Sequence, residues 1–80
     1  DRSGGFNPVG DPLFEALRGL RRDLAAEAGV PPYVIFHDST LRDMAALRPR
    51  DLAELGQLVG IGARKLEAYG EAFLAVIREN

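Results

Sequence analysis

The sequence predicts an all-α domain, a compact bundle of about five helices of which two are long and three short. Two segments carry apolar residues at helical spacing, and prolines and glycines divide the chain between them into shorter pieces. The 80 residues are rich in Leu and Ala and poor in Val, Ile and Thr, which favours helix over strand. A chain of this length makes one domain with a single core.

The N-terminal part divides into a linker at residues 1–11 and the start of a helical domain at 12–80. Three glycines and a proline among the first ten residues are typical of a flexible linker. Asp11 and Pro12 predict a helix start, because Asp is a good N-cap and Pro suits the first helical position. Gly29 is expected to end this helix in the left-handed conformation. The stripe expected to face the core comprises Leu13, Leu17, Leu20, Leu24 and Ala28.

The middle of the chain is expected to form three short helical elements. Residues 33–36 favour a strand by propensity, but no second strand-like run exists to pair with them, so we expect a helical turn that plugs the core. The side chains of residues 38–40 can then cap a helix that Pro49 stops, with apolar positions Leu41, Met44, Ala45 and Leu47. Asp51 and Glu54 resemble a capping box for a helix carrying Leu52, Leu55 and Leu58.

The second long helix is predicted at about residues 63–79. Its stripe comprises Leu66, Tyr69, Phe73, Val76 and Ile77. Gly70 lies near that stripe, and because a mid-helix Gly costs about 1 kcal/mol against Ala, we infer that another backbone packs close to it. The residues expected to be largely buried are Leu17, Leu20, Leu24, Phe36, Leu41, Leu66, Phe73 and Ile77.

The residue inventory excludes several functions. The absence of Cys excludes disulfides, thiolate nucleophiles and cysteine zinc sites, and a single histidine, His37, excludes a multi-histidine metal site. His37 next to Asp38 invites a catalytic interpretation, but no nucleophile motif accompanies the pair, so a solvent-facing or capping His is the better account. No apolar run approaches the roughly 20 residues that cross a bilayer. We therefore expect no catalytic residue, no metal, no cofactor of the domain's own and no membrane association.

The sharpest local pattern is an apolar-Gly-apolar-Gly turn between two expected helices. Gly60 and Gly62 permit close backbone approach, as in the hairpin of helix-hairpin-helix DNA-binding modules. The unpaired N–H groups of the following helix, its dipole, and the side chains of Arg64 and Lys65 would together favour an anion. A tight helix connector that binds no ligand explains the same pattern.

Two further features could contact nucleic acid. An exposed Tyr33 could stack on a base, although it could also pack at the edge of the core with its hydroxyl in water. Arg18, Arg21 and Arg22 lie on the first helix among Glu15 and Asp23, a pattern that a solvated, salt-bridged face also explains. The net charge of −2 argues against tight nonspecific DNA binding but permits a local basic patch.

Three separated segments together resemble the HRDC (helicase and RNase D C-terminal) domain. They are residues 13–18, residues 30–41 with the sequence VPPYVIFHDSTL, and residues 60–70 with the sequence GIGARKLEAYG. The resemblance covers about residues 12–78, and the VPPYVIF segment is most similar to RecQ-type DNA helicases.

The resemblance implies an HRDC-like, non-catalytic helical domain that modulates DNA-structure binding in a RecQ-like helicase acting in DNA repair or recombination. ATP and Mg²⁺ would belong to the parent enzyme. The partner would be single-stranded or branched DNA, bound with modest affinity, and the expected location is the nucleoid in a bacterium or the nucleus in a eukaryote. The residues it nominates are Tyr33, Gly60, Gly62, Arg64 and Lys65, and Arg18 and Arg22 of the first helix complete the expected nucleic-acid-binding set.

This sequence also departs from a strongly basic member of that family. It has one Lys, and Glu67 and Glu71 separate Arg64 from Arg78 on the last helix. The alternative function is therefore a protein-interaction module that docks on its own helicase core or on a partner through an acidic surface at Glu67 and Glu71.

Overall fold

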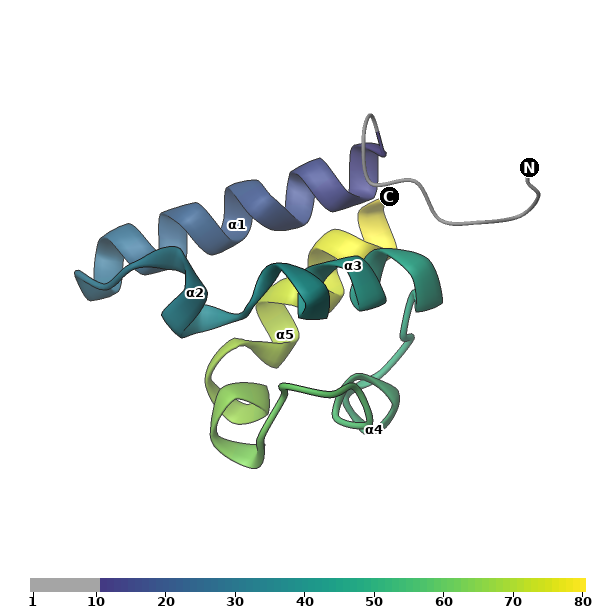
Figure 1. The fold of residues 1–80 in the computed structure, drawn as a ribbon. Helices are drawn as coiled ribbons and strands as arrows, with labels where there is room; N and C mark the ends of the chain where they lie inside the picture. Colours follow the sequence, from purple (N-terminus) through teal and green to yellow (C-terminus); the bar gives the residue numbers. More distant parts are fainter. Residues whose placement is uncertain (1–10) are drawn as a thin grey trace.

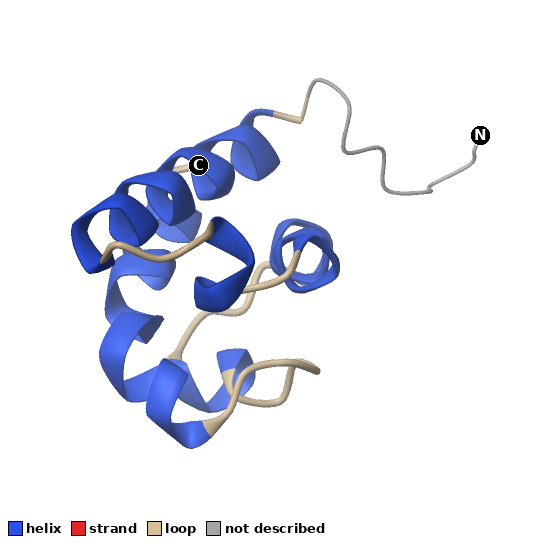
Figure 2. Cartoon of the chain, turned by 60° about the vertical axis from the view of Figure 1, so that its left-hand side comes forward, coloured by secondary structure: helices blue, strands red, loops and turns tan. Residues whose placement is uncertain are grey.

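The computed structural model describes residues 11–80, so the expected linker lies outside the described residues except for Asp11. Five helices follow one another: α1 (Pro12–Ala28), α2 (Pro32–Ile35), α3 (Asp38–Leu47), α4 (Leu52–Leu55) and α5 (Ala63–Glu79). Residues 11–80 contain no strand (Figure 2), and the predicted all-α class is confirmed. The long helices α1 and α5 run antiparallel, with α2 and α3 packed on α1 and α4 packed on α5 (Figure 1).

The core lies between the two long helices and is closed by α2, α3 and the α4–α5 turn. Phe36, just after α2, is its centre: its ring meets that of Phe73 edge-on, at 5.0 Å between centroids, and packs similarly on Tyr69. The segment at 33–36 is thus helical and plugs the core through Ile35 and Phe36, as expected. The buried apolar residues are Leu13, Phe14, Leu17, Ala25, Ile35, Phe36, Leu41, Met44, Ala45, Leu55, Ile61, Phe73, Leu74 and Ile77.

Local capping signals fix three helix ends as predicted, both ends of α1 and the start of α4. The Asp11 carboxylate accepts hydrogen bonds from the N–H groups of Leu13 and Phe14, and Gly29 ends α1 at φ 70°. The Asp51 carboxylate accepts from the N–H of Glu54 at 2.9 Å. Glu54 in turn accepts from the N–H of Arg50 rather than from Asp51, so the capping box reaches one residue further back than its usual form.

The buried face of α1 differs from the predicted stripe. Leu13 and Leu17 are fully buried, whereas Leu20 and Leu24 are only half-buried and Ala28 is exposed. Arg21 and Ala25 take the inner positions instead, because α2 and α3 pack on that side of the helix. The apolar pattern alone predicts a stripe about one residue away from the observed buried face, because it assigns the charged Arg21 to solvent. Leu66 on α5 is likewise half-buried rather than buried.

The predicted side-chain capping of α3 is wrong. The helix starts at Asp38 with His37 as its N-cap, and no side chain caps it. The Asp38 carboxylate binds Arg21 instead, and the hydroxyl of Thr40 donates to the carbonyl of Val59. Both side chains therefore hold distant segments together rather than the start of their own helix.

The inference about Gly70 also needs correction. A Cβ at this position would lie 2.7 Å from Leu52 Cδ2 and 3.2 Å from Leu66 Cδ1, so side chains, not a second backbone, occupy the space. The absence of a side chain at Gly70 lets α4 seat its leucines on α5. At the end of α3, Leu47, one of the predicted apolar positions of that helix, is 66% exposed.

Candidate nucleic-acid interface

The one-turn helix α2 exposes Pro32, Tyr33 and Val34 to solvent and directs Ile35 to the core, together with Phe36 just after it. Pro31 and Pro32 prevent α1 from continuing, and Pro32 starts α2 at a position that needs no N–H. With Ile35 and Phe36 directed inward, Tyr33 is left 59% exposed and Val34 39% exposed. The alternative in which Tyr33 packs at the edge of the core with only its hydroxyl in water does not fit this exposure.

Tyr33 borders a shallow hollow between α2 and the start of α3. The hollow has a volume of about 510 Å³, and its rim includes Tyr33, His37, Ser39 and Arg42. The rings of Tyr33 and His37 lie 6.0 Å apart and are tilted by 31°. An exposed aromatic ring beside a guanidinium is an arrangement that can take a base and its phosphate together.

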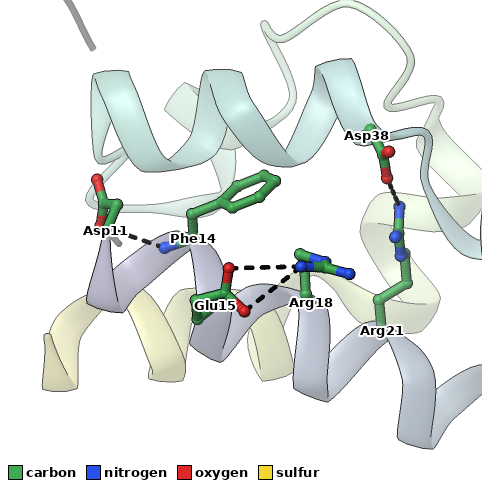
Figure 3. Close-up of polar contacts among 6 residues, drawn as sticks. All are labelled: Asp11, Phe14, Glu15, Arg18, Arg21 and Asp38. Atoms are coloured by element: carbon green, nitrogen blue, oxygen red, sulfur yellow. Dashed lines mark hydrogen bonds and ion pairs between the residues drawn. The ribbon is translucent and has the colours of Figure 1, made fainter. Parts of the chain in front are cut away.

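An ion pair between the buried Arg21 and the largely exposed Asp38 lines this hollow (Figure 3). Arg21, only 9% exposed, donates from Nη1 to Asp38 Oδ1 at 2.7 Å and to the carbonyl of Phe36 at 3.0 Å. The hydrogen bond from Arg21 lowers the pKa of Asp38, and the charges of Arg21, Arg18 and Arg42 lower it further, against the opposing effect of desolvation. Arg21 therefore has a structural function: it ties α1 to α2 and α3, and it neutralises the carboxylate in the hollow.

The other side of α2 faces the start of α5. Val34, Arg64, Lys65 and Tyr69 line a second hollow of about 240 Å³. The Lys65 ammonium lies 5.9 Å from the centroid of the Phe36 ring, within range of a cation–π contact. The fold thus brings Arg64 and Lys65 next to α2, so that cations lie on both sides of Tyr33 and Val34.

The turn before α5 is shaped by its first glycine. Gly60 has φ 93°, and a Cβ there would lie 2.5 Å from Thr40 Oγ1, so only Gly fits. Gly62 is the N-cap of α5 at φ −83° with open space around it. The group close to Gly60 is thus the Thr40 side chain and not a second backbone, and nothing lies close to Gly62, so anion binding at this turn stays a prediction.

The remaining nominated residues lie further along the helices. Arg18 pairs with Glu15 at 3.4 Å (Figure 3). Arg22 approaches Asp23 at 3.7 Å, so both arginines belong to the exposed, salt-bridged face of α1. Neither lines the two hollows beside α2. The acidic residues Glu67 and Glu71 are exposed on α5 and form no ion pair within residues 11–80.

The motifs did not nominate Arg42 and His37 for this surface. Arg42 follows Asp38 by one helical turn, which puts it on the same face of α3, and His37 follows Tyr33 by four residues. These spacings were visible in the sequence, but only the packing of α2 and α3 side by side on α1 shows that they converge on one hollow. Within residues 11–80, no group of three or more His, Cys, Asp or Glu side chains is placed to hold a metal ion. None of the described helices is long and apolar enough to cross a bilayer.

Comparison with known proteins gives consistent matches. The model of the HRDC domain family matches residues 11–77. The chain is 43% identical over 68 residues to the ATP-dependent DNA helicase RecQ of Haemophilus influenzae and 46% identical over 68 residues to that of Bacillus subtilis, covering 85% of this chain in each case. It is also 46% identical over 70 residues, 88% of the chain, to the ATP-dependent DNA helicase UvrD2 of Mycobacterium tuberculosis.

The solved structure of D. radiodurans RecQ HRDC domain 3 superposes with a TM-score of 0.81 at 48% identity, over 84% of this chain and 88% of that one. The matched segment accounts for only 10–12% of the length of these three helicases.

Proposed function

Because the chain belongs to the HRDC family, we propose that it is a non-catalytic accessory domain of a RecQ-type DNA helicase, and that it binds single-stranded or branched DNA with modest affinity. The match to RecQ helicases over most of this chain supports the parent enzyme. ATP and Mg²⁺ would be bound by a motor domain elsewhere in that longer protein. The domain would act by holding a DNA strand near the motor in repair or recombination.

The observation that carries the DNA proposal is the exposed Tyr33 with cations on both sides of it. Its ring offers a stacking platform for one base, which is worth about 1–3 kcal/mol and tolerates any sequence. Arg42 on one side, and Arg64 and Lys65 on the other, would then contact the phosphates that flank this base. Because the Arg21 guanidinium compensates the Asp38 carboxylate, this acid repels the strand less than a free carboxylate would.

The experiment is a fluorescence-anisotropy titration of the 80-residue chain with single-stranded, duplex and branched DNA at 50 and 200 mM salt. Three phosphate contacts at about −0.7 each give a slope of log affinity against log salt near −2, hence about a twentyfold loss between the two salt concentrations. Tyr33→Ala should weaken single-strand binding by about 1–3 kcal/mol, whereas Tyr33→Phe, the matched control, should keep the stacking and the affinity. Absence of binding at 50 mM, or equal affinities for both variants, would contradict the proposal.

The alternative function is docking on a protein through Glu67 and Glu71, and their exposure without ion-pair partners in the described part of the chain supports it. If the pair serves docking, Glu67→Gln with Glu71→Gln should leave DNA binding of the domain unchanged. The same change should then alter DNA binding of the full-length helicase.

A further inference from the structure

A second basic surface lies on the side of the bundle away from α2, where the loop between α3 and α4 meets the C-terminal end of α5 (Figure 1). A hollow of about 470 Å³, the arginine hollow, is lined there by Arg48, Pro49, Arg50, Ile77 and Arg78. Arg48 is the left-handed C-cap of α3, at φ 48°. Pro49 and Ile77 are buried, so three guanidinium groups surround an apolar floor.

None of these three arginines forms an ion pair within residues 11–80, although the Glu54 carboxylate accepts a hydrogen bond from the backbone N–H of Arg50. Within residues 11–80, the ion pairs of the domain involve Arg18, Arg21 and Arg22 on α1, and none reaches the arginine hollow. Arg78 donates from Nη2 to the carbonyl of Arg50 at 3.1 Å, which holds its guanidinium over the loop and leaves its other donors available. The fold therefore gathers three like charges that repel one another unless an anion lies between them.

An apolar hollow of about 370 Å³ adjoins the arginine hollow and shares Pro49 with it. Its other lining residues are Leu47, Leu58, Glu54 and Gln57. Leu47 is 66% exposed at the end of α3, although the rest of that helix buries its large apolar side chains. Arginine is enriched in protein interfaces, and the exposed leucine beside this hollow offers an apolar contact next to the arginines.

We propose that the two hollows together bind a partner polypeptide segment in which acidic side chains flank one large aliphatic or aromatic residue. The apolar residue would enter the hollow at Leu47 and Leu58, and the carboxylates would pair with Arg48, Arg50 and Arg78. Arginine suits this role, because its fork binds a carboxylate through two parallel hydrogen bonds.

The surface suits such a peptide better than a nucleic-acid strand. The Glu54 carboxylate lines the apolar hollow and would repel any anion placed there. A nucleic-acid strand carries a negative charge at every nucleotide, whereas a peptide can place its apolar residue in this hollow and its carboxylates only beside the arginines. This peptide site would be separate from the proposed DNA face beside α2, so the two proposals can fail independently.

The test is selection of a displayed library of random 12-residue peptides on the 80-residue chain, followed by affinity measurement with the enriched peptides. We expect these peptides to carry Asp or Glu within three residues of Leu, Ile, Phe or Trp. Two triple variants, each removing three positive charges, separate the surfaces. They are Arg48→Gln/Arg50→Gln/Arg78→Gln for the arginine hollow, and Arg42→Gln/Arg64→Gln/Lys65→Gln for the face beside α2.

The arginine-hollow variant should bind the enriched peptides at least tenfold more weakly, and the matched control should stay within twofold of the wild type. Leu47→Ser, at an exposed position, should also weaken binding at least fivefold and serves if the triple variant does not fold. Enriched peptides without the acidic and apolar combination, or equal losses in both triple variants, would overturn the proposal. So would an oligo-dT strand whose binding is lost in the arginine-hollow variant alone, because the cluster would then be a DNA site.

Discussion

Replacing Gly60 with Ala should destabilise the domain much more than the same change at Gly62, two residues later. Gly60 has φ 93°, where a residue with a Cβ is strained by about 1–2 kcal/mol. Its new methyl group would also lie 2.5 Å from Thr40 Oγ1, so the threonine side chain would have to turn away. Gly62 has φ −83° and no atom within 4 Å of an added Cβ, so neither cost arises there.

The displaced hydroxyl adds the second part of the cost. Thr40 is 2% exposed and donates to the carbonyl of Val59 at 3.1 Å, so breaking this bond leaves buried polar groups unsatisfied, at about 1–3 kcal/mol. Together with the backbone strain, Gly60→Ala should cost about 2–5 kcal/mol of a total near 4–12 kcal/mol for a chain of this size. At about 4–8 °C per kcal/mol, the Tm should fall by about 8–40 °C.

Thermal and urea unfolding followed by circular dichroism measures these differences. Gly62→Ala should lie within about 0.5 kcal/mol of the wild type. In a Thr40→Ala background, Gly60→Ala should cost only the backbone strain, so the double-mutant cycle should show a coupling of about 1 kcal/mol or more. Equal stabilities of the two glycine variants, or a coupling near zero, would refute the assignment of the close contact to Thr40.

Three further predictions concern the core, the ion pair and the acidic face. Phe73→Ala should lower the free energy of unfolding by about 3–5 kcal/mol through cavity formation, because this ring is fully buried against Phe36. A loss below about 0.5 kcal/mol in urea unfolding would mean that the core is misplaced. Because the pKa of Asp38 in the folded domain lies below its ordinary value of 3.8, its contribution to stability is complete above that value and is lost as the pH falls through the lowered pKa. Below about pH 5, the stability of Asp38→Asn should therefore depend less on pH than that of the wild type. The difference should be under about 1 kcal/mol, because the carboxylate is largely exposed. Parallel curves of stability against pH for both proteins would contradict this. If α5 contacts DNA, Glu67→Gln with Glu71→Gln should raise the affinity for DNA at 50 mM salt about two- to fourfold. The reason is that each carboxylate about 10 Å from a phosphate repels it by some tenths of a kcal/mol. An unchanged affinity would count against DNA contact at this face.

The helix boundaries were predictable because their signals are local. Asp11 and Gly29 cap α1 through contacts within a few residues, and Ala63–Glu79 matches the helix predicted from apolar spacing. Arg21 could not be placed in this way, since its partners are the carbonyl of Phe36 and the carboxylate of Asp38, which only the folded chain brings together.

In the candidate site, too, single residues were predictable from local motifs, whereas their arrangement in space was not. Tyr33, Arg64 and Lys65 could be nominated from their motifs, but nothing local shows that α2 lies against the start of α5. The side chain of Thr40 makes the same point: the sequence favours a local cap, whereas its hydroxyl donates to a carbonyl 19 residues away. Residues with short polar side chains can serve either role, and tertiary packing decides between them.

The most direct test of the central claim is mapping of a single-stranded oligo-dT on the isotopically labelled chain by two-dimensional NMR at 50 mM salt. A DNA face centred on α2 predicts that the largest shift changes occur at Tyr33, Val34, His37, Arg42, Arg64 and Lys65. These changes should diminish together at 200 mM salt and largely disappear in Tyr33→Ala, while the backbone signals of Arg48, Arg50 and Arg78 stay in place. Shift changes confined to those three arginines, or a spectrum that oligo-dT leaves unchanged, would contradict the claim.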